Sequence, residues 1–185
     1  MSDYLIDSDA FHAMRSLRLL VELCARLPLD RPLLMVGYAA YVELNPLQRE
    51  IQALRSNGHL AIREVVKKSS AGERMRSLIR RGVDKGEAEA IAWAVETFER
   101  DKRPIFVSVD FNARRFATSN QLVAVDLMGA IVEWVEDGLL DRAKAMELTV
   151  IWDDRSKEQG RPSDYQTFEH TYAQRLTVRK QRLGL

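Results

Sequence analysis

The sequence predicts an α/β domain built around a central, mainly parallel sheet. Short apolar runs alternate along the chain with longer segments whose apolar residues recur at the helical period, and this alternation is typical of parallel sheets with helices on both faces. The chain has 185 residues, of which 46% are hydrophobic. This is enough to bury one sizeable core and too little for two large domains.

Apolar runs bounded by turn residues predict the strands. The run after Pro104 is rich in β-branched and aromatic residues, and the first run, which starts at Asp3, ends in an acid. The run after Asn57-Gly58 is compatible with either a strand or an extended connector. The expected strands are 3–7, 33–36, 59–63, 105–109 and 122–125.

Helical periodicity and its boundary residues predict the helices between these strands. Pro28 and Pro32 end the first helix, Gly37 begins the turn into the second, and Gly82 suits a C-terminal cap of the third. The expected helices are 10–26, 37–54, 69–81, 87–100, 112–117 and 127–135.

A change in composition near residue 151 divides the chain into a domain over 1–150 and an extension over 151–185. From residue 155 onward the extension carries seven basic and three acidic residues. Phe168, Tyr172 and Leu176 recur every four residues, which predicts a docked amphipathic helix. Whether this helix packs on its own domain or on a second copy in a homodimer is left open.

Charge and cysteine content limit the possible partners and compartment. The net charge is +1, so contact with nucleic acid needs a local patch. Residues 63–85 contain eight basic and three acidic residues, which fits either phosphate binding or a solvated helix face. Cys24 stands alone, and no segment has the layout of a signal peptide or the length of a membrane span. We therefore expect a cytoplasmic protein without membrane contact. The candidate RNA-binding residues in this patch are Lys67, Lys68, Arg80, Arg81 and Lys85.

Acids placed at the ends of apolar segments predict a metal site. Asp7 and Asp110 follow strand-like runs, and parallel sheets carry their reactive crevice beyond the carboxyl ends of the strands. Glu87 and Glu89 lie in the first turn of a helix, where the helix dipole alone also favours acids. Glu87 continues the apolar stripe of that helix, whereas Glu89 is expected to point toward Trp93. Oxygen ligands without a His or Cys cluster suit Mg²⁺ or Mn²⁺.

Taken together, these motifs resemble the PIN-domain nucleases, most closely the bacterial branch that includes the VapC-type toxin ribonucleases. The resemblance covers about residues 4–141. It rests on the order and spacing of the motifs. Their residues are Asp7-Ser8-Asp9, Tyr41-Val42-Glu43-Leu44, Asp84 to Ala92, Ser108-Val109-Asp110 with Ala113-Arg114, and Met128-Gly129 through Gly138-Leu139-Leu140.

The resemblance implies a three-layer α/β/α fold in which acids around Mg²⁺ or Mn²⁺ activate water to cut RNA. It implies Asp7 and Asp110 as principal ligands, Glu43 as a third acid, and Glu87 or Glu89 as the helix acid. The helix acid is commonly Asp in the toxins, and Asn is frequent where Asp9 stands here. A small antitoxin typically occupies the groove beside the acids. The supporting residues implied are Ser8, Asp9 and Ser108, with Arg114 added to the RNA-binding set.

Two other readings compete with a metal-dependent endoribonuclease. One is a PIN-like module that binds RNA or a protein without cutting. The other is a haloacid-dehalogenase-like phosphatase, because Asp7-Ser8-Asp9 also resembles the opening motif of that family, and Ser108 and Asp153-Asp154 could supply later ones. The phosphatase reading leaves Glu87 and Glu89 unexplained.

Overall fold

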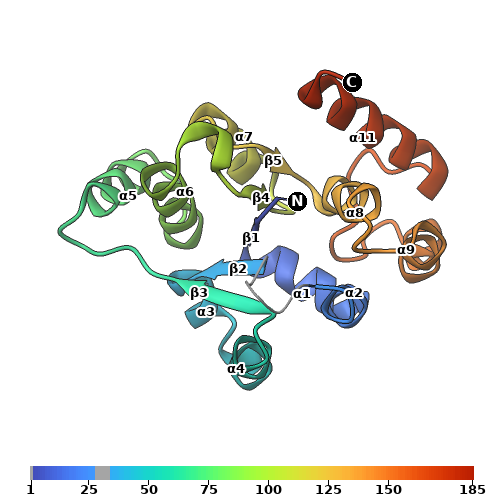
Figure 1. The fold of residues 1–185 in the computed structure, drawn as a ribbon, viewed down its shortest axis with the longest axis horizontal. Helices are drawn as coiled ribbons and strands as arrows, with labels where there is room; N and C mark the ends of the chain where they lie inside the picture. The colour runs from blue at the N-terminus through green and yellow to red at the C-terminus, as the bar shows by residue number, and fades with distance from the viewer. Residues whose placement is uncertain (1, 28–33) are drawn as a thin grey trace.

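Five parallel strands form one sheet in the part of the chain that the structure describes, which is residues 2–27 and 34–185 of a computed structural model (Figure 1). The strand order is β3-β2-β1-β4-β5, so β1 lies at the centre with β2 on one side and β4 on the other. This confirms the predicted α/β class and the parallel sheet. The strands are β1 (Tyr4–Ile6), β2 (Leu34–Gly37), β3 (Leu60–Arg63), β4 (Ile105–Val107) and β5 (Ala124–Val125).

Alternate side chains of the strands enter two separate cores, one on each face of the sheet. Tyr4 and Ile6 of β1 belong to one core, and Leu5 belongs to the other. The first core is covered by α1 (Ser8–Ser16), α2 (Leu19–Cys24), α4 (Gln48–Ser56) and α8 (Leu127–Glu136). The second core is covered by α5 (Ser70–Arg80), α6 (Lys85–Thr97) and α7 (Phe111–Ser119). The molecule is therefore a three-layer α/β/α structure, as predicted.

Two of the expected helices are each broken in the structure. The segment predicted as one helix over 10–26 forms α1 and α2, which are separated at Arg18, a residue with a left-handed φ of 59°. The segment over 37–54 forms α3 (Tyr38–Glu43), the 3-10 turn η1 (Asn45–Leu47) and α4. Pro46 lies in η1 and cannot donate a backbone hydrogen bond, which explains the break. The prolines predicted to end the first helix, Pro28 and Pro32, and the predicted first residue of the second strand, Leu33, lie outside the described residues.

The C-terminal extension shares the first core. Its helices are α10 (Ile151–Asp154) and α11 (Phe168–Leu183), which follow α9 (Arg142–Thr149). Outside the extension, a further 3-10 turn, η2 (Arg100–Lys102), precedes β4. Trp152, Phe168 and Tyr172 are buried in the same cluster as β1, and α11 packs against α8. The predicted amphipathic helix is thus confirmed, and it docks on its own domain. Over the same described ranges, no helix is both long and apolar enough to cross a bilayer.

Candidate active site

Asp7 and Asp110 lie at the same edge of the sheet. Asp7 follows β1 and Asp110 lies three residues beyond β4, and these two strands pair in parallel with Ile6 opposite Val107. The Asp7 N–H donates to the Val107 carbonyl oxygen at 3.1 Å. Each aspartate also caps the helix after it: Asp7 Oδ1 accepts from Ala10 N at 2.6 Å, and Asp110 Oδ1 accepts from Ala113 N at 2.7 Å. The two carboxylates are therefore fixed close to the backbone at neighbouring strand ends.

An acidic cavity of about 490 Å³ opens beside Asp7. We call it the acidic cavity. It draws residues from the starts of α1 and α6 and from α3, so segments far apart in the sequence meet there. Five carboxylates and one lysine line it. The lining residues are Asp7, Ser8, Asp9, Ala40, Glu43, Asp84, Lys85, Gly86 and Glu87.

The acids around this cavity repel one another. Burial raises the pKa of Asp7 to about 6; hydrogen bonds from Ser108 and Ala10 oppose the rise, and the charges of Asp9 and Asp110 add to it. Burial also raises the pKa of Glu87 to about 7, with further contributions from Asp110 and other acids. A cation held between these carboxylates would relieve both the burial cost and the repulsion.

Glu43 enters the cavity from the end of α3 and is held by Ser8. The Ser8 hydroxyl donates to Glu43 Oε2 at 2.9 Å. The start of α6 lies against this carboxylate, since a Cβ at Gly86 would be in van der Waals contact with Glu43 Oε2 at 3.4 Å. Ser8 and Glu43, which the resemblance named separately, therefore act as one unit at the cavity wall.

Glu87 and Glu89 have different surroundings. Glu87 lines the acidic cavity, whereas Glu89 is only 4% exposed and lies outside the cavity lining. Glu89 Oε2 accepts from Ala39 N at 2.5 Å, and its Oε1 accepts from Val65 N at 3.4 Å. Glu89 therefore joins α6 to α3 and to the chain after β3, rather than pointing toward Trp93 as expected. The geometry favours Glu87 as the acid that faces the site.

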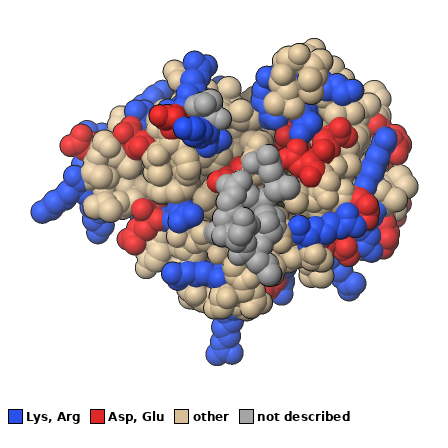
Figure 2. Space-filling view, in the orientation of Figure 1, with Lys and Arg blue, Asp and Glu red and all other residues tan. Residues whose placement is uncertain are grey.

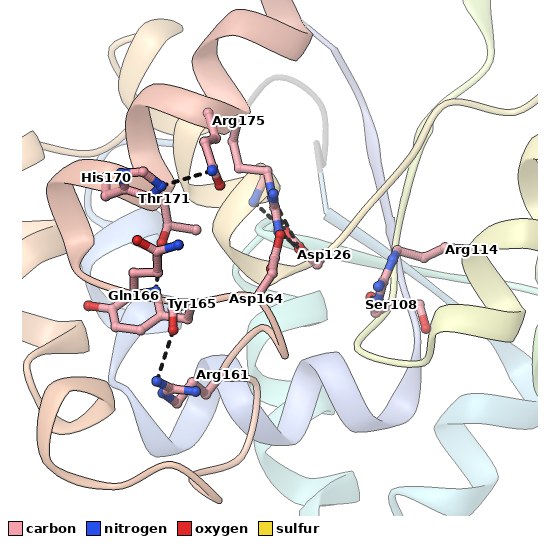
Figure 3. Close-up of polar contacts among 12 residues, drawn as sticks. Ser108, Arg114, Asp126, Arg161, Asp164, Tyr165, Gln166, His170, Thr171 and Arg175 are labelled. Carbon is pink, nitrogen blue, oxygen red and sulfur yellow. Dashed lines mark hydrogen bonds and ion pairs between the residues drawn. The ribbon is translucent and has the colours of Figure 1, made fainter.

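Ser108 forms hydrogen bonds with both principal acids, Asp7 and Asp110. It is fully buried, its Oγ accepts from Asp110 N at 3.1 Å, and its hydrogen bond to Asp7 lowers the pKa of that carboxyl. Arg114 Nη1 donates to the Ser108 carbonyl oxygen at 2.7 Å (Figure 3). The predicted supporting residue Ser108 and the predicted RNA-binding residue Arg114 thus meet beside Asp110.

The candidate RNA-binding lysines and arginines fall into two groups. Lys85 lines the acidic cavity itself. Apart from Arg114 on α7, the others are exposed in the loop before α5 or at the end of α5, which packs against α6, and Figure 2 shows basic side chains along this edge of the molecule. This second group consists of Lys67, Lys68, Arg80 and Arg81.

Two acids near the site were not among the predicted site residues. Asp84 precedes α6 and lines the acidic cavity. Asp126 follows β5 and caps α8, with its Oδ1 accepting from Gly129 N at 2.7 Å. The rule that selected Asp7 and Asp110 also applies to Asp126, because it too directly follows an apolar strand. Asp153, by contrast, accepts from the Tyr165 hydroxyl at 2.9 Å and does not line the cavity, so the phosphatase reading gains no second motif there.

The donor set suits a hard divalent cation. Carboxylate oxygens with room for water are what Mg²⁺ and Mn²⁺ take in proteins, and Asp7, Glu87 and Asp110 supply them. Across residues 2–27 and 34–185, no three His, Cys, Asp or Glu side chains already converge tightly enough to make a metal site as they stand. Binding would therefore require the less buried carboxylates of Glu87 and Asp110 to close around an ion at Asp7, with waters completing its shell.

Comparisons of the chain with protein-family models, with curated proteins and with solved structures found no match.

Proposed function

We propose that this protein is a metal-dependent endoribonuclease that hydrolyses RNA phosphodiester bonds at the acidic cavity. One observation carries the proposal: Asp7, Glu43 and Glu87, remote in the sequence, line one cavity, and Asp110 follows the strand that pairs with the strand before Asp7. Such a cluster fits a divalent cation and a phosphate substrate. RNA as the substrate follows from the resemblance to the PIN-domain nucleases.

Each residue has a role in this proposal. Asp7, Asp110 and Glu87 hold Mg²⁺ or Mn²⁺, which when bound supplies Lewis-acid polarisation of the phosphate and a more acidic water. Ser108 positions Asp7 and Asp110 through its hydrogen bonds. Glu43, held by Ser8, accepts a proton from water at the cavity wall.

The resemblance also supplies the biological setting that we propose. A toxin of this kind is held inactive by a small antitoxin that covers the acidic cavity. Such a partner would need basic groups to face the five carboxylates of the cavity lining.

The test is RNA cleavage by the purified chain with and without metal. We expect cleavage with Mg²⁺ or Mn²⁺, loss of cleavage with EDTA, and loss of at least about a hundredfold in Asp7→Asn and Asp110→Asn. Asn is as good a helix cap as Asp, so both variants should keep α1 and α7 and remain folded. Mn²⁺ binding, measured by calorimetry, should weaken in the same two variants.

A matched control guards against a contaminating nuclease. Asp141→Asn also replaces an aspartate just before a helix, but Asp141 is exposed and pairs with Arg26 away from the cavity. It should cleave like the wild type. Equal cleavage by wild type, Asp7→Asn and Asp110→Asn would refute the proposal. Metal-free binding of RNA without any cleavage would favour the binding-module reading instead.

A further inference from the structure

A second cavity, of about 670 Å³, lies next to Asp110. We call it the basic cavity. Val109 and Phe111, which flank Asp110 in the chain, both line it. The strand that leads to Asp110 pairs in parallel with the strand that leads to Asp7 of the acidic cavity, so the two cavities lie at the same edge of the sheet. The volume falls in the range of about 300–1,000 Å³ that small-molecule sites occupy.

The wall of the basic cavity holds two arginines that bind backbone carbonyls rather than carboxylates. Arg114 donates to the Ser108 carbonyl oxygen at 2.7 Å, and Arg161 donates to the carbonyl oxygens of Trp152 and Tyr165 at 2.8 and 3.0 Å. Carbonyl groups fix a guanidinium without neutralising its charge. Figure 3 shows both arginines around the cluster in which Arg175 binds Asp126 and Asp164. Arg175 offsets one of these two negative charges. With Lys157 and Glu158 included, the cavity lining carries four basic and three acidic side chains, a net charge of +1.

Phe111 gives the same cavity an exposed aromatic ring. Its side chain is 67% exposed although it is large and apolar, and the guanidinium of Arg114 lies 6.0 Å from the ring centre. The tryptophans Trp134 and Trp152 are fully buried and cannot serve as stacking surfaces. An exposed ring beside free positive charge is the combination that single-stranded nucleic acid uses, with the base stacked on the ring and the phosphate near the cation.

We propose that the basic cavity is a nucleotide subsite for single-stranded RNA, with the base stacked on Phe111 and its phosphate bound by Arg114 and Lys157. This rests on the proposed function for the identity of the strand, and it adds how the strand is held beside the acids. The subsite lies immediately beyond Asp110, so it binds the nucleotide next to the scissile phosphate. It requires unpaired bases, because a base in a duplex has no free face to offer Phe111.

The test is RNA binding, measured separately from cleavage. A fluorescently labelled ten-nucleotide oligouridylate is titrated with the full-length protein in EDTA, and anisotropy gives the dissociation constant. Phe111→Ala should weaken binding at least about fivefold, and Phe111→Trp should restore it, because stacking contributes in proportion to the aromatic surface. Met146→Ala, which removes an exposed apolar side chain on α9, should bind like the wild type.

Salt dependence separates the phosphate contact from the stacking contact. Arg114→Ala should reduce the slope of log K against log salt by about 0.7, the value for one phosphate contact on a single strand. Its neighbour Arg115 is exposed and does not line the cavity, so Arg115→Ala makes the same charge change and should leave the slope unchanged. Phe111→Ala should lower affinity without changing the slope.

The outcomes are distinct. Unchanged affinity in Phe111→Ala, or equal affinity for a duplex of the same length, would overturn the subsite. An equal loss of salt slope in Arg114→Ala and Arg115→Ala would overturn the assignment of Arg114 to a phosphate contact. Phe111-dependent binding without metal-dependent cleavage would support the subsite and refute the nuclease, so the two proposals fail separately.

Discussion

Arg175 of α11 binds both carboxylate oxygens of Asp126, the residue that joins β5 to α8. Its Nη2 lies 2.7 Å from Oδ2, and its Nε lies 3.3 Å from Oδ1. Nη2 also binds Asp164 at 2.6 Å (Figure 3). Through this contact the C-terminal helix is tied to the sheet edge that carries the candidate active site. The extension also supplies much of the wall of the basic cavity.

Replacing Arg175 should destabilise the protein. Asp126 and Arg175 are only 11% and 20% exposed, so Arg175→Ala leaves a largely buried carboxylate without its partner. Removal of one member of such a pair costs about 3 kcal/mol in the free energy of unfolding. Urea denaturation measures this loss.

The matched control for Arg175→Ala is Arg15→Ala. Arg15 pairs with Glu50, but both side chains are at least 41% exposed. An exposed pair contributes less than about 1 kcal/mol, so this variant should stay near the wild type. Equal losses in the two variants would show that the Arg175 contact contributes no more than an ordinary surface pair.

Glu87 and Glu89 should separate function from stability. Glu89→Ala leaves the Ala39 and Val65 N–H groups without their buried acceptor and should cost about 3 kcal/mol in unfolding free energy. Glu87→Ala removes a carboxylate whose burial raises its pKa, so it should keep or increase stability while abolishing metal binding. Thermal denaturation and Mn²⁺ calorimetry on both variants give the comparison. A stable Glu89→Ala variant that has lost metal binding would contradict this assignment.

The sequence predicted the positions of Asp7 and Asp110 because their placement depends on one local rule. An acid that directly follows an apolar strand lies at the carboxyl edge of a parallel sheet, wherever the strand sits in the order. Asp126 obeys the same rule. It follows the expected strand 122–125 but was not selected, and the contact that marks its importance is with Arg175, 49 residues away.

The roles of Glu87 and Glu89 could not be separated by helical periodicity. Periodicity describes only the faces of α6, whereas Glu89 is set by its contact with the start of α3, about 50 residues earlier. Gly37 allows this approach, since a Cβ there would lie 3.3 Å from Glu89 Oε2. Tertiary contacts of this kind have no signal in local spacing.

The metal-free protein should become more stable as the pH falls from about 8 to about 5.5. The pKa of Glu87 is raised to about 7 and that of Asp7 to about 6, so the folded state binds protons that the unfolded chain does not yet hold. The stabilisation is gained as the pH falls through these raised values. Melting temperatures in EDTA measure it.

Magnesium should oppose this pH dependence. Protons compete with the ion for Asp7 and Glu87, so added Mg²⁺ should raise the melting temperature more at pH 8 than at pH 5.5. Glu87→Gln should show a smaller pH effect in EDTA, because one of the two titrating groups is gone. If lowering the pH in EDTA raises the melting temperature of Glu87→Gln as much as that of the wild type, the pH effect does not come from Glu87.

Gly72→Ala should destabilise the protein although Ala favours helices. Gly72 lies in the first turn of α5, where a Cβ would approach the Lys67 carbonyl oxygen to 2.5 Å and the Val66 carbonyl oxygen to 2.7 Å. Ala gains about 1 kcal/mol of helix propensity, but overpacking against backbone costs about 1–3 kcal/mol, so a net loss is expected. Ser77→Ala, at an exposed position of the same helix, should show no loss of unfolding free energy in urea. Lys67 moves with this backbone, so Gly72→Ala should also weaken RNA binding if the loop before α5 contacts phosphates. A loss of stability with unchanged RNA affinity would instead assign Lys67 and Lys68 to a solvated surface.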